Sequence, residues 1–401
     1  MALPRSDAYA VEALHELRMK VDVLRPIAGC RGVRDVGRHQ LFPGRGQVHV
    51  RFELATDWAP HAEFPCKQGA NTESASIAIT LRGTAIILPS SGKISPILDR
   101  KCMMASMKFG GFYEHQLPRP WAQHSDHKIL KDALDQVELS DRVGFDYIWA
   151  TEHHFLEEYA HSSAPEVFLA ACSQRTKNVR IGHGIVQTPP AINHPARVAE
   201  RIATLDLISD GRVEFGTGAG ATETELGGFL VPQDKKKAMQ MEGFRVAIRM
   251  LAEEPFTGHE GDFVRVPPRN LKPKPLQRPH PPLWMACSNR NSIIQAAKLG
   301  LGALTFSFVS PEEARQWVKD YYEVMENECE PIGYAVNPNF AIACPFLLGR
   351  DEAQVGQMAA DAYGFFLYGL GHYSFFGEHR PGSTDIWDEI TSFTVEGQPH
   401  L

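Results

Sequence analysis

The chain has 401 residues, of which 43% are hydrophobic and 22% are charged, and its formal net charge is −7. No apolar run approaches the roughly 18 residues of a membrane span. The acidic balance argues against a nucleic-acid-binding protein. The seven cysteines are scattered without C-x-x-C spacing, a pattern that favours reduced thiols in a cytoplasm over a disulfide scaffold or a metal site. We therefore expect a cytoplasmic globular protein without a bound metal.

The first hundred residues differ in character from the rest. Runs such as RPIAGCRGVRDVGRHQLFPGRGQ combine glycine, arginine and proline without an apolar period, which indicates little ability to bury a core. Met103, Met104 and Met107 stand just before the first clear strand. We therefore expect residues 1–103 to be an N-terminal extension with few contacts to the rest, disordered or produced by a mis-assigned start. A small genuine domain is the alternative.

From residue 104 onward, short apolar strands alternate with helix-period segments. Strands are expected at 108–113, 145–150, 179–187, 212–216, 283–286, 303–306 and 340–346. Helices are expected at 126–143, 165–175, 195–208, 237–251, 292–299, 311–329 and 352–370, with a hairpin near 256–266. Strands separated by single helices pair in parallel, because antiparallel neighbours need no crossover. Both a barrel and an open doubly wound sheet fit this alternation.

The end of the chain contains too few strands to close a barrel. Only residues 390–395 look strand-like after the last helix, and no helix follows them. A missing eighth strand would leave the first and seventh strands with unpaired edges. We therefore expect seven parallel strands in residues 107–401, an incomplete barrel, and a gap that the tail or the N-terminal extension must cover. The chain would then be a fragment of a longer product.

Adjacent polar residues follow the second expected strand. Glu152, His153 and His154 would lie at the mouth of a barrel, where imidazoles can exchange protons near neutral pH. Structural histidines bonded to backbone groups are an equally good interpretation.

Two further segments could bind an anion or a flat ligand. Gly218, Ala219, Gly220 and Ala221 follow the fourth strand, and the glycines allow close approach of the backbone; a flexible turn is the alternative. Ser288, Asn289, Arg290 and Ser292 precede a helix, whose N-terminus favours anions. Plain helix capping is the alternative there.

The three segments together resemble the bacterial luciferase-like monooxygenase family. The similarity runs through GFDYIWATEHHF, HPARVAERIATLDLISDGRVEFGTGAG and SNRNSIIQAAKLGLGA. The resemblance implies a TIM-type (β/α)8 barrel and reduced FMN as a diffusible co-substrate, or the deazaflavin F420 in a sister branch.

The resemblance also implies roles for individual residues. His153 matches the histidine that supports the flavin hydroperoxide, with Glu152 and His154 as its neighbours. His183 and Gly184 lie where the family often has a non-prolyl cis peptide beneath the flavin. The glycine segment matches the flavin-contacting loop, although Ala219 stands where the family has an arginine, and Arg290 is the expected substitute at the phosphate.

The implied function is oxygenation of a small hydrophobic molecule by reduced FMN and O2. A separate flavin reductase would supply the cofactor, and a homodimer is possible within the family. The alternatives are an F420-dependent oxidoreductase and a non-catalytic flavin-binding relative. The loops at 231–237 and 363–387, the first apolar in part and the second rich in aromatic residues, suggest a hydrophobic substrate.

Overall fold

The computed structural model describes residues 107–347, 349, 351–374 and 379–392, together with four short upstream strands. These are β1 (Val48–Arg51), β2 (Glu63–Cys66), β3 (Ala75–Leu81) and β4 (Ile86–Ile87). The chain divides into two compact units, Met1–Glu73 and Ser74–Leu401. In the first unit β1 and β2 pair antiparallel. The second unit contains the strands and helices that position the candidate site.

Seven parallel strands form the sheet of the larger unit. In the order of pairing they are β5 (Lys108–Tyr113), β6 (Tyr147–Ala150), β7 (Arg180–Gln187), β8 (Val213–Gly218), β11 (Leu283–Cys287), β12 (Gly302–Phe306) and β14 (Phe340–Phe346). All seven strands expected from the sequence are therefore confirmed, and so is their parallel pairing. The expected hairpin is also present, as β9 (His259–Glu260) paired with β10 (Arg265–Val266).

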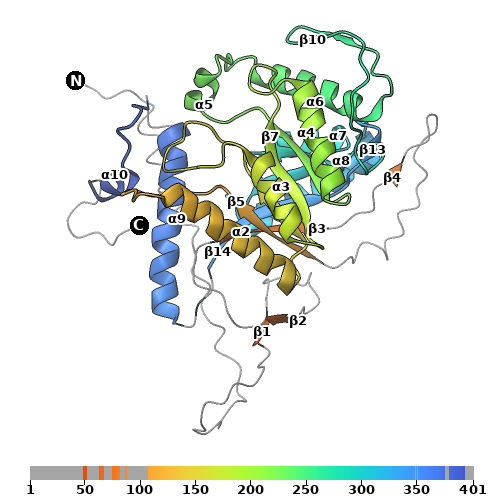
Figure 1. Ribbon diagram of the computed structural model, residues 1–401. Helices are drawn as coiled ribbons and strands as arrows, with labels where there is room; N and C mark the ends of the chain where they lie inside the picture. Colours follow the sequence, from red (N-terminus) through yellow and green to blue (C-terminus); the bar gives the residue numbers. More distant parts are fainter. Residues whose placement is uncertain are drawn as a thin grey trace. The chain divides into compact units, whose positions relative to one another are not determined.

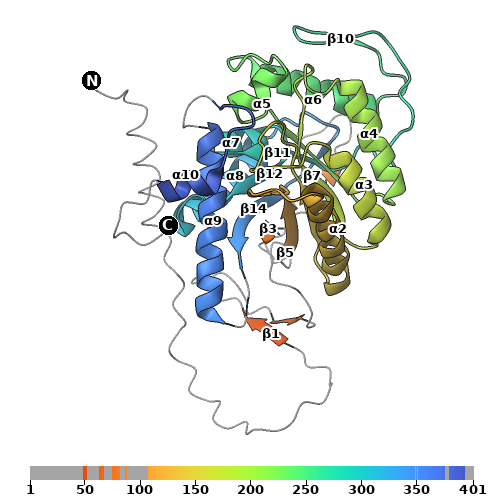
Figure 2. The ribbon, with the colours of Figure 1, turned by 60° about the vertical axis from the view of Figure 1, so that its left-hand side comes forward.

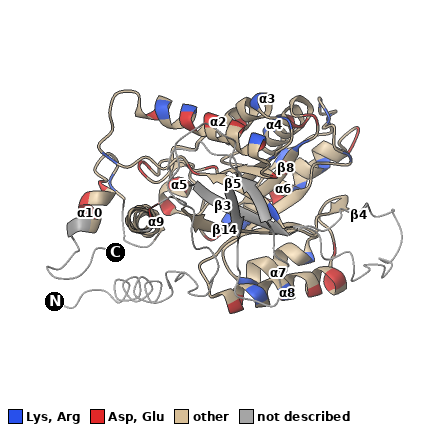
Figure 3. Ribbon diagram, turned by 90° about the horizontal axis from the view of Figure 1, so that it is seen from below, with Lys and Arg blue, Asp and Glu red and all other residues tan. Residues whose placement is uncertain are grey.

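Helices follow the strands and surround the sheet (Figures 1 and 2). They are α2 (Ser125–Val143), α3 (Pro165–Arg175), α4 (Pro195–Ile208), α5 (Glu223–Gly228), α6 (Lys236–Ala252), α7 (Arg290–Lys298), α8 (Pro311–Glu328), α9 (Glu352–Ser374) and α10 (Ile386–Ser392). Proline opens α3, α4 and α8, where its missing N–H costs no helical bond. Acidic and basic residues lie mainly on such outer helices (Figure 3). None of the described helices has the length and apolar character to cross a membrane.

The gap between the first and last parallel strands is filled from upstream. β3 pairs antiparallel with β14 on one side and with β5 on the other, which closes the barrel. This differs from the expectation that residues 1–103 make few contacts with the barrel, because β3 satisfies the backbone groups that β5 and β14 would leave unpaired. Apart from the four short strands, residues 1–103 lie outside the described residues.

The expected strand at residues 390–395 is wrong in its described part. Residues up to Ser392 belong to α10 (Ile386–Ser392), and the remainder lies outside the described residues. A further short strand, β13 (Ala335–Val336), pairs antiparallel with β4 (Ile86–Ile87) in a two-stranded sheet separate from the barrel sheet.

The lower interior of the barrel is filled by large aromatic side chains. Trp149 and Trp284 are almost completely buried, and their rings meet edge to face at 5.2 Å. Glycine stands opposite each indole: a Cβ at Gly182 would lie 2.2 Å from Trp149 Cε3, and one at Gly302 would lie 2.3 Å from Trp284 Cε3. Glu214 accepts a bond from Trp284 Nε1 at 2.6 Å and pairs with Arg180, so this part of the interior combines large rings with one buried ion pair.

We expect the substitution Gly182→Ala to destabilise the protein. The added methyl group has no room beside the buried Trp149 ring, and overpacking of this kind costs about 1–3 kcal/mol. The matched control is Gly364→Ala in α9, where nothing lies within 4 Å of the new atom and alanine favours the helix. Denaturant unfolding of the two variants measures the difference. Equal midpoints for Gly182→Ala and the wild type would contradict this packing argument.

Candidate functional site

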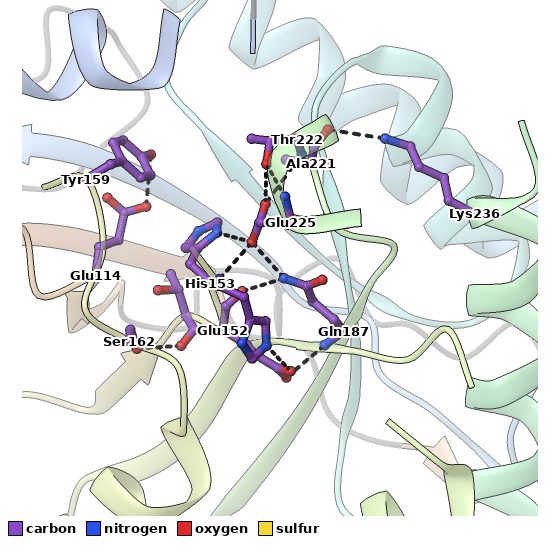
Figure 4. A network of polar contacts seen from close by, with 12 residues as sticks. Glu114, Glu152, His153, Tyr159, Ser162, Gln187, Ala221, Thr222, Glu225 and Lys236 are labelled. Carbon is purple, nitrogen blue, oxygen red and sulfur yellow. Dashed lines mark hydrogen bonds and ion pairs between the residues drawn. The ribbon is translucent and has the colours of Figure 1, made fainter. Parts of the chain in front are cut away.

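The carboxyl ends of β5, β6, β7 and β8 meet at one rim of the barrel, because these strands are parallel and adjacent. The loops that follow them carry Glu114, His153, Gln187 and the glycine segment, which the chain separates by up to about a hundred positions. Barrel enzymes place their active sites at this rim. Figure 4 shows these side chains in one polar network.

His153 is held by a buried carboxylate that the sequence alone did not single out. Its Nδ1 lies 2.9 Å from Oε1 of Glu225, a side chain with no exposed surface. The same oxygen accepts bonds from the His154 backbone N–H at 3.2 Å and from Gln187 Nε2 at 2.9 Å. Nδ1 of His153 is therefore fixed toward Glu225, and Nε2 has no hydrogen-bond partner in the described part of the chain.

Glu225 is positioned by the first turn of α5. The Thr222 hydroxyl accepts the Glu225 N–H at 3.1 Å, and the Thr222 N–H donates to the Glu225 carboxylate at 3.3 Å. This reciprocal capping box orients the carboxylate. The T-x-x-E spacing at residues 222–225 is a sequence signal for such a helix start, but it does not reveal that the glutamate also faces His153.

The two partners shift each other's proton affinity. Burial disfavours the charged form of Glu225, but the facing His153 and the bonds from His154 and Gln187 outweigh it and lower the pKa of Glu225. Burial likewise disfavours a charged His153, yet the carboxylate of Glu225 outweighs it and raises the pKa of the imidazole. Each partner therefore favours the charged form of the other, an imidazolium beside a carboxylate.

Glu152 and His154 hold the loop in place through hydrogen bonds, a role different from that of His153. The Glu152 carboxylate accepts bonds from His154 Nε2 at 3.0 Å, Asn193 Nδ2 at 2.6 Å and the Gln187 backbone N–H at 3.0 Å. The His154 ring also meets Phe229 edge to face at 4.8 Å. These contacts tie the loop after β6 to β7 and α5. Glu152 and His154 are therefore structural residues of the motif, and His153 remains its candidate functional residue.

A second carboxylate, Glu114, lies on the other side of His153 (Figure 4). It is 8% exposed and accepts a bond from the Tyr159 hydroxyl at 3.3 Å. Burial raises the pKa of Glu114 to about 7, against the opposing charge of His153. Glu114 directly follows β5, where the sequence analysis predicted a strand but no site residue.

His183 and Gly184 occupy opposite faces of β7. His183 points outward and lines a small cavity with six other residues, namely Glu152, Glu166, Val186, Val198, Arg201 and Ile202. Burial lowers its pKa to about 4, so the ring is neutral. Gly184 faces the interior beside Trp149 and Phe112. The expected non-prolyl cis peptide is present, between Gly184 and Ile185, but the His183 side chain does not reach the mouth.

The glycine segment, residues 218–221, has little or no side chain at the end of β8. A Cβ at Gly218 would lie 2.4 Å from Ile185 Cδ1, and Gly220 has a φ of +82°. Ala219 is half-buried and Ala221 is exposed. The Ala221 carbonyl accepts a bond from Lys236 Nζ at 3.3 Å. Lys236 therefore brings a cation to the segment where the family's arginine is replaced by Ala219.

Residues 288–292 form the capped N-terminus of α7. Asn289 Oδ1 accepts the Ser292 N–H at 3.1 Å, and Ser292 Oγ accepts the Asn289 N–H at 3.1 Å. Ser288 is exposed beside them. Arg290 Nε donates to Asp320 at 2.6 Å. The capping interpretation is confirmed. The Arg290 guanidinium, which was expected to bind a phosphate, is thus already paired with Asp320 through its Nε.

Aromatic side chains form a cluster above the barrel interior, of which the sequence analysis indicated only Phe366, within residues 363–387. Phe306 lies 5.5 Å from Phe112, 5.0 Å from Phe308 and 6.0 Å from Phe366, measured between ring centroids. Phe366 in turn stacks on Tyr159 at 6.0 Å. We call Phe112, Phe306, Phe308 and Phe366 the aromatic wall. The ends of two strands, β5 and β12, and α9 supply it, so no single stretch of sequence carries the signal.

The comparisons with known proteins agree with this geometry. A family model described as luciferase-like monooxygenase matches residues 107–389. The chain therefore belongs to the luciferase-like monooxygenase family, whose named relatives include flavin-dependent enzymes. It is 32% identical over 173 residues to the oxygenase component of a flavin-dependent trigonelline monooxygenase from Acinetobacter baylyi, covering 42% of this chain and 46% of that protein.

Two other relatives extend the comparison. Limonene 1,2-monooxygenase from Rhodococcus erythropolis is 38% identical over 144 residues, which are 34% of this chain and 35% of that protein. The solved structure of monooxygenase RslO1 from Streptomyces bottropensis is 28% identical, with a TM-score of 0.58 over 66% of this chain and 79% of that one. The chain spans about half the length, or less, of these curated relatives.

Among the described residues no group of three or more potential ligands could hold a metal ion.

We expect the substitution Glu225→Gln to destabilise the protein at pH 7 by about 3 kcal/mol, because it leaves a buried imidazolium without its counter-charge. Glu223→Gln, on the exposed side of the same helix, is the matched control. The wild-type carboxylate has a lowered pKa in the folded state. Its contribution is therefore present above the ordinary pKa of a glutamate and is lost as the pH falls through the lowered value. Denaturant unfolding at pH 7 and pH 3 checks this, and a difference between the variants that does not shrink in acid would contradict it.

Proposed function

We propose that this protein is a flavin-dependent monooxygenase that uses reduced FMN and O2 to oxygenate a small hydrophobic molecule. The observation that supports this most directly is the His153–Glu225 pair, which holds a charged imidazole at the barrel mouth beside the aromatic wall. An imidazolium can donate a proton near neutral pH. Aromatic side chains at the same mouth favour an apolar substrate.

The residues at the mouth fit a flavin in two ways. The interior faces of β7 and β8 carry glycine at Gly184, Gly216 and Gly218, and the Ile185 side chain lies against the two glycines of β8, which gives a flat ring an apolar surface at the mouth. β8 and β11 are neighbours in the sheet, so the glycine segment and residues 288–292 end at adjacent points of the rim. The free N–H groups at the start of α7, with Lys236 and Arg290 nearby, suit a phosphate.

When bound, a reduced flavin supplies the electrons that activate O2, and the protein supplies the surroundings. Glu225 fixes Nδ1 of His153 and leaves Nε2 to hold a proton toward the mouth. Glu152 anchors the loop through His154, Asn193 and Gln187. The aromatic wall excludes water, which protects reactive species from proton leakage. The residue that moves a proton in this scheme is His153.

We further propose that a separate reductase delivers the reduced flavin. One relative is named as the oxygenase component of its monooxygenase, and a component system of that kind divides reduction from oxygenation.

Anaerobic titration with reduced FMN and, in parallel, with reduced F420 tests the cofactor. The proposal expects saturable binding of FMN and, once air is admitted with an apolar test substrate such as limonene or decanal, incorporation of one atom of labelled oxygen. Preference for F420 would replace the proposal with an F420-dependent oxidoreductase. Binding of FMN without oxygenation of any test substrate, under conditions where reduced FMN is consumed at the uncatalysed rate, would indicate a non-catalytic flavin-binding protein.

We expect His153→Ala to retain FMN binding within a few fold but to lower the oxygenation rate by about 10²–10⁴-fold, the usual contribution of a general acid or base. Hydrogen peroxide release should rise correspondingly. The control is His161→Ala, a histidine of the same loop whose ring bonds Asp126 instead of the mouth residues. Product formation and peroxide are measured together. A wild-type rate in His153→Ala would make His153 structural.

We expect Lys236→Ala and Arg290→Ala each to weaken FMN binding by roughly tenfold, the size of a charge-assisted bond. Riboflavin, which lacks the phosphate, should bind the variants as it binds the wild type. The control is Arg265→Ala, an exposed arginine that pairs with Glu260. Fluorescence titration with both flavins gives the ratio. Equal losses for FMN and riboflavin would show that neither cation meets the phosphate.

A further inference from the structure

We propose that Glu114 is a positioning residue that controls how firmly His153 holds its proton. Together with Tyr159, it forms a second carboxylate partner across the imidazole from Glu225. The inference concerns the charge of the site itself. Its meaning for the reaction rests on the proposed function, but its measurement does not.

The position of Glu114 follows from the alternation of β5. Phe112 faces the barrel interior, where it packs with Trp149 and Leu304, whereas Tyr113 packs against the outer core. Glu114, two residues after Phe112, returns to the interior side. There the Tyr159 hydroxyl donates to its Oε1 at 3.3 Å. The Tyr159 ring lies edge to face with His153 at 5.8 Å. Figure 4 shows Glu114 and Tyr159 on one side of His153 and Glu225 on the other.

Three carboxylates surround the imidazole, each from a different part of the rim. Glu225 comes from α5, Glu152 from the loop that carries His153, and Glu114 from the end of β5; all three favour the protonated ring. Glu225 stays ionised because His153 and three hydrogen bonds hold its pKa low. Tyr159 stays neutral, because burial raises the pKa of its hydroxyl well above 10.

Glu114 is the carboxyl of this group that changes charge near neutrality. Burial raises its pKa to about 7, so it is neutral in mild acid and ionised in mild base. Below that pH the imidazolium and Glu225 neutralise each other. Above it, Glu114 adds a further negative charge beside the ring, and His153 releases its proton less readily. In an enzyme that draws a proton from His153, the rate would therefore fall as the pH rises through about 7.

The test is a nuclear magnetic resonance titration of His153 between pH 5 and 10 in flavin-free protein labelled at histidine Cε1. His153→Gln identifies the signal among the 17 histidines. In Glu114→Gln the midpoint should be lower than in the wild type by roughly one pH unit, the lower end of the shift caused by a nearby charge. Glu114→Asp, which keeps the charge, should restore most of the difference. Glu223→Gln should leave the midpoint unchanged.

An unchanged midpoint in Glu114→Gln would overturn the inference. If that variant does not fold, Tyr159→Phe replaces it. Loss of the bond from the Tyr159 hydroxyl should raise the pKa of Glu114 and so lower the His153 midpoint near pH 7. An unchanged His153 midpoint in Tyr159→Phe would also overturn the inference. Failure of the proposed function is a separate result, since absence of FMN binding leaves the His153 titration intact. Once a substrate is known, the alkaline limb of kcat should move in Glu114→Gln while KM stays within a few fold.

Discussion

The buried ion pair between His153 and Glu225 constrains the architecture of the whole mouth. A carboxylate without solvent is tolerated only when an opposite charge and several hydrogen-bond donors surround it. Glu225 obtains these from three segments: the loop after β6 supplies His153 and the His154 N–H, β7 supplies Gln187, and the capping box of α5 supplies the Thr222 N–H. Any rearrangement of these segments would leave a charge unpaired. The pair therefore fixes the relative position of three rim loops.

The barrel makes such a convergence possible because its lower interior is already filled. Trp149 and Trp284 occupy the space beneath the mouth, and Gly182 and Gly302 admit them. Apart from Glu214, which accepts a bond from Trp284 Nε1 at 2.6 Å, the polar side chains of the candidate site gather where the strands end. The same arrangement gives the mouth two unlike sides: carboxylates and an imidazole after β5 and β6, and the aromatic wall from β12 and α9. A proton donor faces an apolar surface across a short distance, which suits oxygenation of a hydrophobic molecule away from bulk water.

The sequence predicted the fold well because its signals are local. Each parallel strand is a short apolar run between helices with recognisable starts, and the seven runs appear where they were expected. β3 was missed because its apolar run does not stand in an alternation with helix-period segments in the sequence. The site was predicted in part. His153 was found because it stands in a motif, whereas Glu225 and Glu114 are isolated glutamates 72 and 39 positions away, and only the closing of the barrel brings them to the imidazole.

The same reasoning explains how the glycine segment can lack the arginine that the family resemblance led us to expect. A phosphate at the rim needs nearby positive charge, but any element ending there can supply it. Ala219 leaves room, and Lys236 reaches the neighbouring Ala221 carbonyl from the start of α6. Arg290 is the first residue of α7, the helix that follows β11, and β11 is the neighbour of β8. Asp320 holds Arg290 through Nε alone, so the outer edge of its guanidinium keeps donors for an anion. Two cations from two helices can therefore replace one from the loop, at the cost of making phosphate binding depend on how α6 and α7 pack against the barrel.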